Sequence, residues 1–273
     1  MSAEVVTLDT AEIRQGREGL VAGLDELLAR KSRRKLFELF PDTGRFRREL
    51  YPKHMEFFAA TKRYMEVGVL GGNRTGKSVS GGFAASCFLT GFYPHWWPGR
   101  VFKGPTKGIA AGRTNKNTRD IIQKKLFGRV INVGGQKRTD GTGLIPFEWI
   151  GPIAWAEGVR DLIDTAQVRH LSGGMSTLRL KSYEQGPGAF EGSEEDFVLL
   201  DEEPPMDVYG EAIIRLTSTT GRPQDNGLMM TTFTPLEGYS DVVILYLPES
   251  MRPIAPMDDG QSGQNAFDAG ADE

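Results

Sequence analysis

The stretch Gly71-Gly72-Asn73-Arg74-Thr75-Gly76-Lys77-Ser78 has the form G-x-x-x-x-G-K-S. It follows the apolar run 67–70, which suits a strand, and it precedes residues 79–89, which predict a helix rich in small residues. Glycines at such a junction let backbone N–H groups turn inward around phosphate groups, and the helix N-terminus adds positive partial charge. The stretch therefore predicts a phosphate-binding loop between a strand and a helix, which is a unit of α/β folds.

Two side chains of this loop have predicted roles toward a nucleotide and its metal ion. Lys77 would reach the β- and γ-phosphates, and the Ser78 hydroxyl would coordinate Mg²⁺. The alternative is a chance match, because the chain has 34 glycines in 273 residues. Such a composition yields the motif by chance in roughly one chain in fifty, so the strand and helix around it favour nucleotide binding. The predicted loop contacts are Gly71, Gly72, Asn73, Arg74, Thr75, Gly76, Lys77 and Ser78.

A second motif follows the continuous apolar run 197–200, which is typical of a parallel strand buried on both faces. Asp201 and Glu202 come directly after it, at the strand end where open α/β sheets bind their ligands. Asp201 would hold Mg²⁺ through water, and Glu202 would orient and deprotonate an attacking water. The pair favours hydrolysis, whereas the alternative is a solvated acidic turn.

A third strand, predicted over residues 227–232, ends in hydroxyl side chains. Thr231, Thr232 and Thr234 would sense the γ-phosphate there and pass its loss to a moving segment. The alternative is that threonine occurs here only for its strand propensity.

Upstream of the loop, Tyr51 and His54 are suited to stacking on an adenine ring and to hydrogen bonding its edge. The alternative is a helix start with core aromatics, Phe57 and Phe58, and the sequence supports both readings equally.

The composition, with 39% apolar and 10% aromatic residues, is typical of a packed globular protein. No apolar run approaches the roughly 20 residues that a membrane span needs. The single cysteine, Cys87, excludes an internal disulfide and fits a helix core. The three histidines are scattered without cysteine partners, which argues against a zinc site.

Positive charge is concentrated in two runs although the net charge is only −3. Residues 29–63 carry 11 Lys and Arg against 4 acids, and residues 101–138 carry 10 against 1. Each run alone suits a solvated face, but two runs beside a nucleotide site favour a polyanion partner. Residues 251–273 carry one Arg and five acids.

The other predicted elements alternate in the doubly wound pattern. They are helix 11–31, strand 107–111, helix 116–127, a loop or hairpin at 128–150, strands 166–170 and 176–181, helix 207–219 and helix 240–247. We divide the chain into a basic, helical N-terminal arm (1–44), a P-loop ATPase domain (45–249) and an acidic, disordered tail (250–273).

Several blocks, in matching order over roughly residues 45–247, resemble the large terminase subunit of tailed bacteriophages, the ATPase that pumps DNA into proheads. The blocks are 51–54, the loop at 71–78, 96–99, 172–174, 181–186, 201–209 and 232–238.

The resemblance implies an additional-strand, RecA-like P-loop NTPase fold, with a mostly parallel sheet flanked by helices. It implies that Lys77 and Ser78 form the Walker A pair, that Asp201 is the Walker B aspartate and that Glu202 is the catalytic glutamate. Thr231, Thr232 and Thr234 would belong to its coupling motif. Arg74 matches an arginine that such loops often carry, and it could stabilise charge developing on the γ-phosphate.

The family also implies ATP and Mg²⁺ as cofactors, and double-stranded DNA, portal protein, small terminase subunit and ring neighbours as partners. It places the protein in the host cytoplasm, docked transiently on the procapsid and not a stable virion component. A neighbouring subunit would donate an arginine finger, and the candidates in this chain are Arg113, Arg169, Arg179 and Arg222.

One expectation departs from the family pattern. A full large terminase continues into a nuclease domain, whereas only 23 residues follow Ser250 here, so we expect the motor part without nuclease activity. The alternatives are a split or catalytically incomplete terminase that acts as an assembly module, another nucleic-acid translocase, or a small-molecule kinase.

Overall fold

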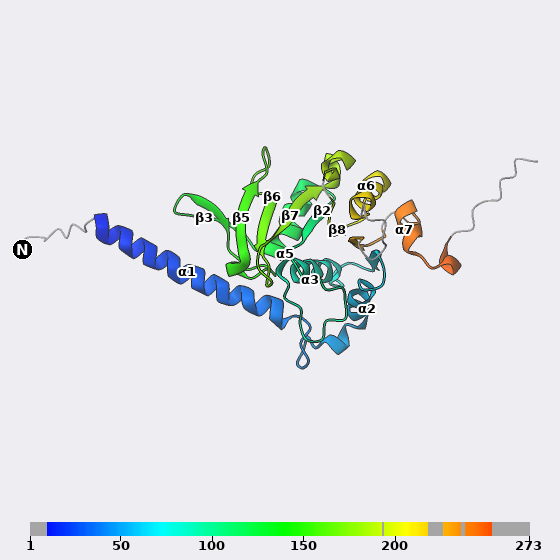
Figure 1. Ribbon diagram of the computed structural model, residues 1–273, viewed down its shortest axis with the longest axis horizontal. Coiled ribbons are helices and arrows are strands. Elements are labelled where there is room, and N and C mark those ends of the chain that lie inside the picture. Colours follow the sequence, from blue (N-terminus) through cyan, green and yellow to red (C-terminus); the bar gives the residue numbers. More distant parts are fainter. Residues whose placement is uncertain (1–9, 193, 218–225, 236–237, 253–273) are drawn as a thin grey trace, which may run out of the picture.

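The computed structural model describes residues 10–192, 194–217, 226–235 and 238–252. Its centre is a seven-stranded sheet with the strand order β1-β9-β8-β2-β7-β6-β5 (Figure 1). Neighbouring strands are parallel from β1 to β7, and β6 and β5 continue antiparallel. The strands are β1 (Glu66–Leu70), β2 (Lys107–Gly112), β5 (Ile150–Trp155), β6 (Ile163–Arg169), β7 (Met175–Ser182), β8 (Phe197–Asp201) and β9 (Leu228–Phe233).

Strand β9 lies between the strand before the phosphate loop, β1, and the acidic strand, β8. The register pairs Leu70 with Phe233 and Asp201 with Thr232, so all three strands end at one level of the sheet. A strand inserted between the two motif strands is the additional strand expected from the resemblance, and the α/β, mostly parallel fold class is confirmed.

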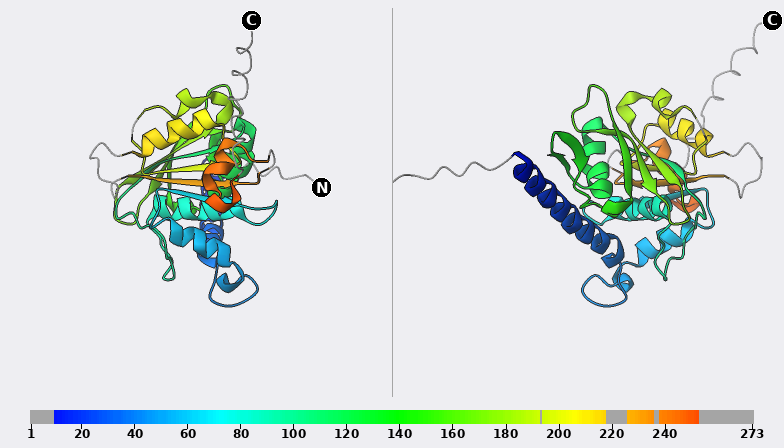
Figure 2. Two further views of the ribbon diagram at one scale, coloured as in Figure 1. Left: turned by 90° about the vertical axis from the view of Figure 1, so that its right-hand side faces the viewer. Right: turned by 60° about the vertical axis from the view of Figure 1, so that its left-hand side comes forward.

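Helices cover both faces of the sheet, as Figure 2 shows. One hydrophobic cluster joins α2 (Pro52–Ala60) and α3 (Lys77–Thr90) to one face, and a second joins α6 (Met206–Leu216) and α7 (Asp241–Tyr246) to the other. Cys87 is fully buried in α3, where burial raises the pKa of its thiol, so the expected core role is confirmed.

The helix predicted at 116–127 is divided into three parts. They are α4 (Asn115–Asn117), the π-helical turn η2 (Thr118–Gln123) and α5 (Lys124–Phe127). The Thr114 hydroxyl caps the start by accepting a hydrogen bond from the Asn117 amide at 3.1 Å. A two-stranded hairpin follows, formed by β3 (Val130–Val133) and β4 (Gln136–Thr139), which confirms the hairpin alternative.

The N-terminal helix is longer than predicted, because α1 (Thr10–Glu38) continues through the basic segment. It projects along the β3 side of the body (Figure 1), where Arg138 forms an ion pair with Asp25. Leu20 and Leu27 remain exposed, so part of the apolar pattern that predicted the helix has no partner within the described residues. The predicted tail lies outside the described residues from 253 onward.

The remaining elements are short single-turn helices: η1 (Arg48–Leu50), η3 (Phe147–Trp149), η4 (Tyr183–Gln185), η5 (Pro187–Phe190) and η7 (Glu249–Met251). Among the helices of the described ranges, none has both the length and the apolar character that crossing a membrane requires.

Gly143 gives a test of how α5 is held. A Cβ at this position would lie 2.2 Å from the Leu126 carbonyl oxygen and 2.5 Å from the Phe127 amide nitrogen, both on rigid backbone. Gly143→Ala should therefore lower the free energy of unfolding by about 1–3 kcal/mol, measured by urea denaturation. Gly104→Ala, which meets no atom within 4 Å, should stay within about 0.5 kcal/mol of wild type. Equal effects of the two substitutions would contradict this packing.

Candidate active site

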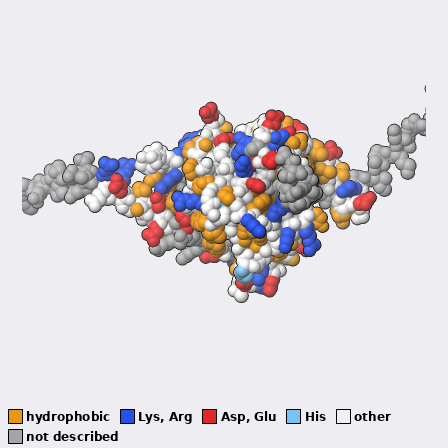
Figure 3. Space-filling view, in the orientation of Figure 1, with side chains coloured by type: hydrophobic (Ala, Val, Ile, Leu, Met, Phe, Trp, Pro, Cys, Tyr) orange, Lys and Arg blue, Asp and Glu red, His pale blue; other side chains and the backbone are white. Residues whose placement is uncertain are grey.

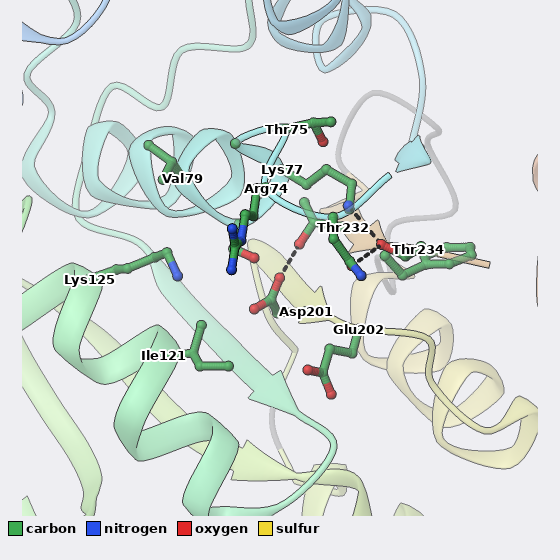
Figure 4. Close-up of a pocket in the computed structure, with 14 residues that line it drawn as sticks. Arg74, Thr75, Lys77, Val79, Ile121, Lys125, Asp201, Glu202, Thr232 and Thr234 are labelled. Carbon is green, nitrogen blue, oxygen red and sulfur yellow. Dashed lines mark hydrogen bonds between the residues drawn. The ribbon is translucent and has the colours of Figure 1, made fainter. Parts of the chain in front are cut away.

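The loop after β1, the start of α3, the ends of β8 and β9, and the η2–α5 segment line a cavity of about 430 Å³ (Figure 4). Gly76 at its edge has φ 87°, a left-handed conformation that suits glycine. Arg74 has φ 64°, which is uncommon for a residue with a side chain. The lining residues are Asn73, Arg74, Thr75, Gly76, Lys77, Ser78, Val79, Ile121, Lys125, Asp201, Glu202, Thr232, Phe233 and Thr234.

Lys77 is folded back onto the loop that carries it. Its ammonium donates hydrogen bonds to the carbonyl oxygens of Gly71 at 2.8 Å and Gly72 at 2.6 Å, and to the Thr234 hydroxyl at 2.8 Å. Burial lowers the pKa of Lys77, and attraction to Asp201 offsets part of that effect. Gly71 and Gly72 thus hold the lysine through their carbonyl groups and do not line the cavity.

Ser78 and Asp201 lie in the same cavity and fit the requirements of a magnesium site. The Asp201 carboxylate is buried and accepts a hydrogen bond from the Thr232 hydroxyl at 2.6 Å, which orients it. Across the described residues, no three His, Cys, Asp or Glu side chains gather into a metal-binding cluster. Mg²⁺ needs no such cluster, because one carboxylate, a hydroxyl, phosphate oxygens and water supply its octahedral shell.

Glu202 has φ 71°, so its backbone is held in a conformation that side chains disfavour. The buried Tyr183 hydroxyl lies 2.9 Å from the Asp201 carbonyl oxygen and 3.0 Å from that of Glu202, and it clamps the turn. The Glu202 carboxylate accepts a hydrogen bond from the Asn117 side-chain amide at 3.0 Å. The following acid, Glu203, is bonded instead to the hydroxyl of Ser240, which caps α7.

The three predicted coupling threonines do not share one position. Thr232 and Thr234 line the cavity, where Thr232 holds Asp201 and Thr234 lies 3.2 Å from the Asn73 side-chain oxygen. Thr231 points to the other face of the sheet, since successive strand residues alternate. It lies there beside Gly68 and the Tyr246 ring.

Tyr51 and His54 lie behind the phosphate loop and not in the cavity lining. The Tyr51 ring packs edge-on against Phe40 and against the His54 ring. The His54 Nε2 atom lies 3.1 Å from the Thr75 carbonyl oxygen, so the imidazole supports the loop backbone.

The candidate arginine fingers differ in exposure and in ion pairing. Arg113 and Arg169 are exposed, whereas Arg179 forms an ion pair at 2.6 Å with the buried Glu195. Arg222 lies outside the described residues.

Sequence reasoning did not assign Asn117, Ile121, Lys125 or Tyr183 to the site. Three of these belong to the α4–η2–α5 segment, which reaches the site only because β2 lies next to β8. The available signal is the basic helix directly after β2, which the charge pattern predicts to be a surface that faces a polyanion.

His54 gives a pH test of the loop support. Burial lowers its pKa below 6.5, and the hydrogen bond to Thr75 offsets part of that shift. As the pH falls below about 6.5, His54 therefore takes up a proton in the unfolded chain before it does so in the folded protein. The free energy of unfolding decreases over the pH range between about 6.5 and the lower pKa of the folded protein. His54→Gln should reduce the loss of unfolding free energy between about pH 7.5 and 5.5, measured by urea denaturation at both values. Identical losses in the variant and wild type would contradict the shift.

Residues 69–261 match the family described as "Terminase large subunit, T4likevirus-type, N-terminal". The chain is also similar to the terminase large subunit of Salmonella phage P22. The two are 33% identical over 228 aligned positions, which cover 76% of this chain and 43% of the P22 protein. The chain thus spans less than half the length of this relative.

Among solved structures, the chain is similar to the large terminase ATPase domain of Thermus phage P74-26. The identity is 17% and the TM-score 0.40, over 67% of this chain and 68% of that one. A point mutant of the same domain matches at 19% identity and a TM-score of 0.40, over 62% and 59% of the two chains. The family match extends over more than half of the sequence, and the P22 relative is more than 30% identical. The chain therefore belongs to the terminase large subunit family, in the region that its family description calls N-terminal.

Proposed function

We propose that this chain is the ATPase motor part of a viral DNA-packaging machine, which couples MgATP hydrolysis to the translocation of double-stranded DNA into a procapsid. The observation that carries the proposal is the meeting of Lys77, Asp201 and Glu202 in one cavity, together with the hydroxyl side chains at the end of β9 and just after it. This set combines phosphate binding, metal binding and water activation.

The residues of the cavity divide the work of hydrolysis among them. Lys77 and Arg74 bind and polarise the phosphates, while Ser78 and Asp201 hold the metal ion. Bound Mg²⁺ supplies positive charge that neutralises the β- and γ-phosphate oxygens. Glu202 orients the attacking water and takes its proton. The hydrogen bond from the Asn117 side-chain amide orients the Glu202 carboxylate.

Strand β9 supplies the coupling between hydrolysis and movement in this proposal. Thr234, just after β9, accepts a hydrogen bond from Lys77, and Thr232 in β9 donates one to Asp201, so both ends of the phosphate site are bonded to β9 and the segment that follows it. A change at the γ-phosphate would alter these bonds together and displace the chain after β9.

The proposed partners are double-stranded DNA, a portal protein, a small terminase subunit and copies of this chain in a ring. The proposed location is the host cytoplasm, with transient docking on a procapsid. Lys and Arg side chains are spread over the face shown in Figure 3 and would meet DNA phosphates.

A second candidate is an assembly module of the same family that binds nucleotide without turnover of its own. The Arg179–Glu195 ion pair favours this candidate, because it already binds one of the four arginines that could act on the nucleotide of a neighbouring subunit. Another nucleic-acid translocase would share the site chemistry, so turnover and DNA binding need separate tests.

Replacing Glu202 tests hydrolysis directly. Glu202→Gln removes the proton acceptor but keeps the shape, so kcat should fall by roughly 10²-fold or more while ATP affinity stays close to wild type. The matched control is Glu203→Gln, since Glu203 does not line the cavity. Steady-state phosphate release and equilibrium ATP binding measure the two effects. Retained turnover in Glu202→Gln would reject its role, and ATP binding that survives Lys77→Ala would count against the loop assignment.

DNA binding tests the partner. Affinity for a short DNA duplex should fall steeply as the salt concentration rises, because bound phosphates release counterions. Lys124→Glu should weaken binding further, since Lys124 is exposed on the second basic run. Arg160→Glu carries the same charge change outside both runs and should bind nearly as wild type. Salt-independent binding, or equal effects of the two variants, would argue for the assembly module.

A further inference from the structure

Lys125 has a place in the fold that its neighbour Lys124 does not share. Lys124 is exposed on the surface of α5, whereas Lys125 is half-buried and lines the phosphate cavity. Figure 4 shows its amine pointing from α5 toward Arg74 and Asp201. The basic run thus divides at this point, with one lysine facing solvent and the next facing the nucleotide site.

The wall that carries Lys125 is fixed to the body of the domain. The Lys125 carbonyl oxygen accepts a hydrogen bond from the Leu144 amide at 2.8 Å, and the Leu126 carbonyl oxygen accepts one from the Ile145 amide at 2.9 Å. Leu126 and Phe127 are fully buried beneath it. The side chain therefore extends into the cavity from a rigid base, opposite the loop that presents Arg74.

The ammonium group of Lys125 has no directly bonded partner within the described residues. Within the described residues its ammonium makes no ion pair or hydrogen bond, although burial removes part of its water. Attraction to Asp201 offsets part of that cost, and repulsion from Lys124 and Lys35 adds to it. Arg74 and Lys77 bring further positive charge into the same cavity. An anion bound between Arg74 and Lys125 would be attracted by both charges and would compensate for the hydration that Lys125 has lost.

We propose that Lys125 binds the terminal phosphate of the nucleotide in cis, from the wall opposite the phosphate loop, and so makes the site prefer ATP to ADP. Asp201 and Glu202 mark the γ-phosphate end of the cavity, and Lys125 lines the same cavity with its charge attracted to Asp201. Lys77, in the loop, binds the β-phosphate that ATP and ADP share as well as the γ-phosphate of ATP. Lys125 is therefore the cation whose loss should separate the two nucleotides.

The inference rests on the proposed function, because it assumes that the cavity takes a nucleoside triphosphate. Two other roles for Lys125 give different outcomes. A structural counter-charge for Asp201 would serve ATP and ADP equally. A contact to DNA would leave nucleotide affinity unchanged when no DNA is present.

The test measures equilibrium binding of ATPγS and of ADP, each with Mg²⁺ and without DNA, to the full chain. Lys125→Gln should weaken ATPγS binding roughly tenfold or more and ADP binding by no more than about twofold. Lys125→Arg should restore most of the ATPγS affinity, since it keeps the charge. Arg160→Gln, which removes an exposed positive charge elsewhere, should change neither affinity. A thermal unfolding curve for each variant checks that it is folded.

The possible results distinguish this inference from the proposed function. If wild type binds both nucleotides and Lys125→Gln loses them equally, or loses neither, the role of Lys125 is rejected and the ATPase proposal stands. If wild type binds neither nucleotide, both are rejected. A selective loss that Lys125→Arg does not restore would also overturn the inference, because the charge would then not be the cause.

Discussion

The parallel pairing of β9 with β1 on one side and β8 on the other is the constraint on which the site depends. It sets the loop after β1 and the acids after β8 one strand apart, with hydroxyl side chains between them. The buried hydrogen bond from Thr232 to Asp201 closes this arrangement at 2.6 Å. Any shift of register by one residue would turn Thr232 to the other face and leave the carboxylate without its donor.

The turn after β8 holds a strained residue at the centre of the proposed chemistry. Glu202 keeps its positive φ because its amide bonds to the Thr232 carbonyl at 2.9 Å and because Tyr183 holds the carbonyl oxygens on either side of its Cα. These groups come from β9 and from the turn after β7. The position of the proposed base is therefore determined by long-range contacts, and local strand preference has little part in it.

The sequence was sufficient for the parts of the site that lie within single motifs. The glycine spacing around Lys77 predicted the loop, and the apolar run before Asp201 predicted the strand. Because the carboxyl ends of parallel strands lie at the same edge of a sheet, these patterns also predicted that the two motifs lie close together. Lys125 and Asn117 could not be found in this way, since their place depends on β2 lying next to β8. Strand β5 was also missed, because Gly151 and Pro152 weaken its alternating pattern. The exposure of Leu20 shows that helical spacing predicted α1 without predicting its partner.

The π-helical turn η2 acts as a phase shift along the segment that carries Lys125. Such a turn contains about one residue more than an α-helical turn, and each residue turns the helix by about 100°. Everything after η2 is thereby rotated by one residue position relative to a continuous α-helix starting at Asn115. In that continuous helix Lys124 would occupy the inward direction and Lys125 would point away from the cavity. The extra residue in the π-helical turn therefore decides which of two adjacent lysines faces the cavity and which one faces solvent.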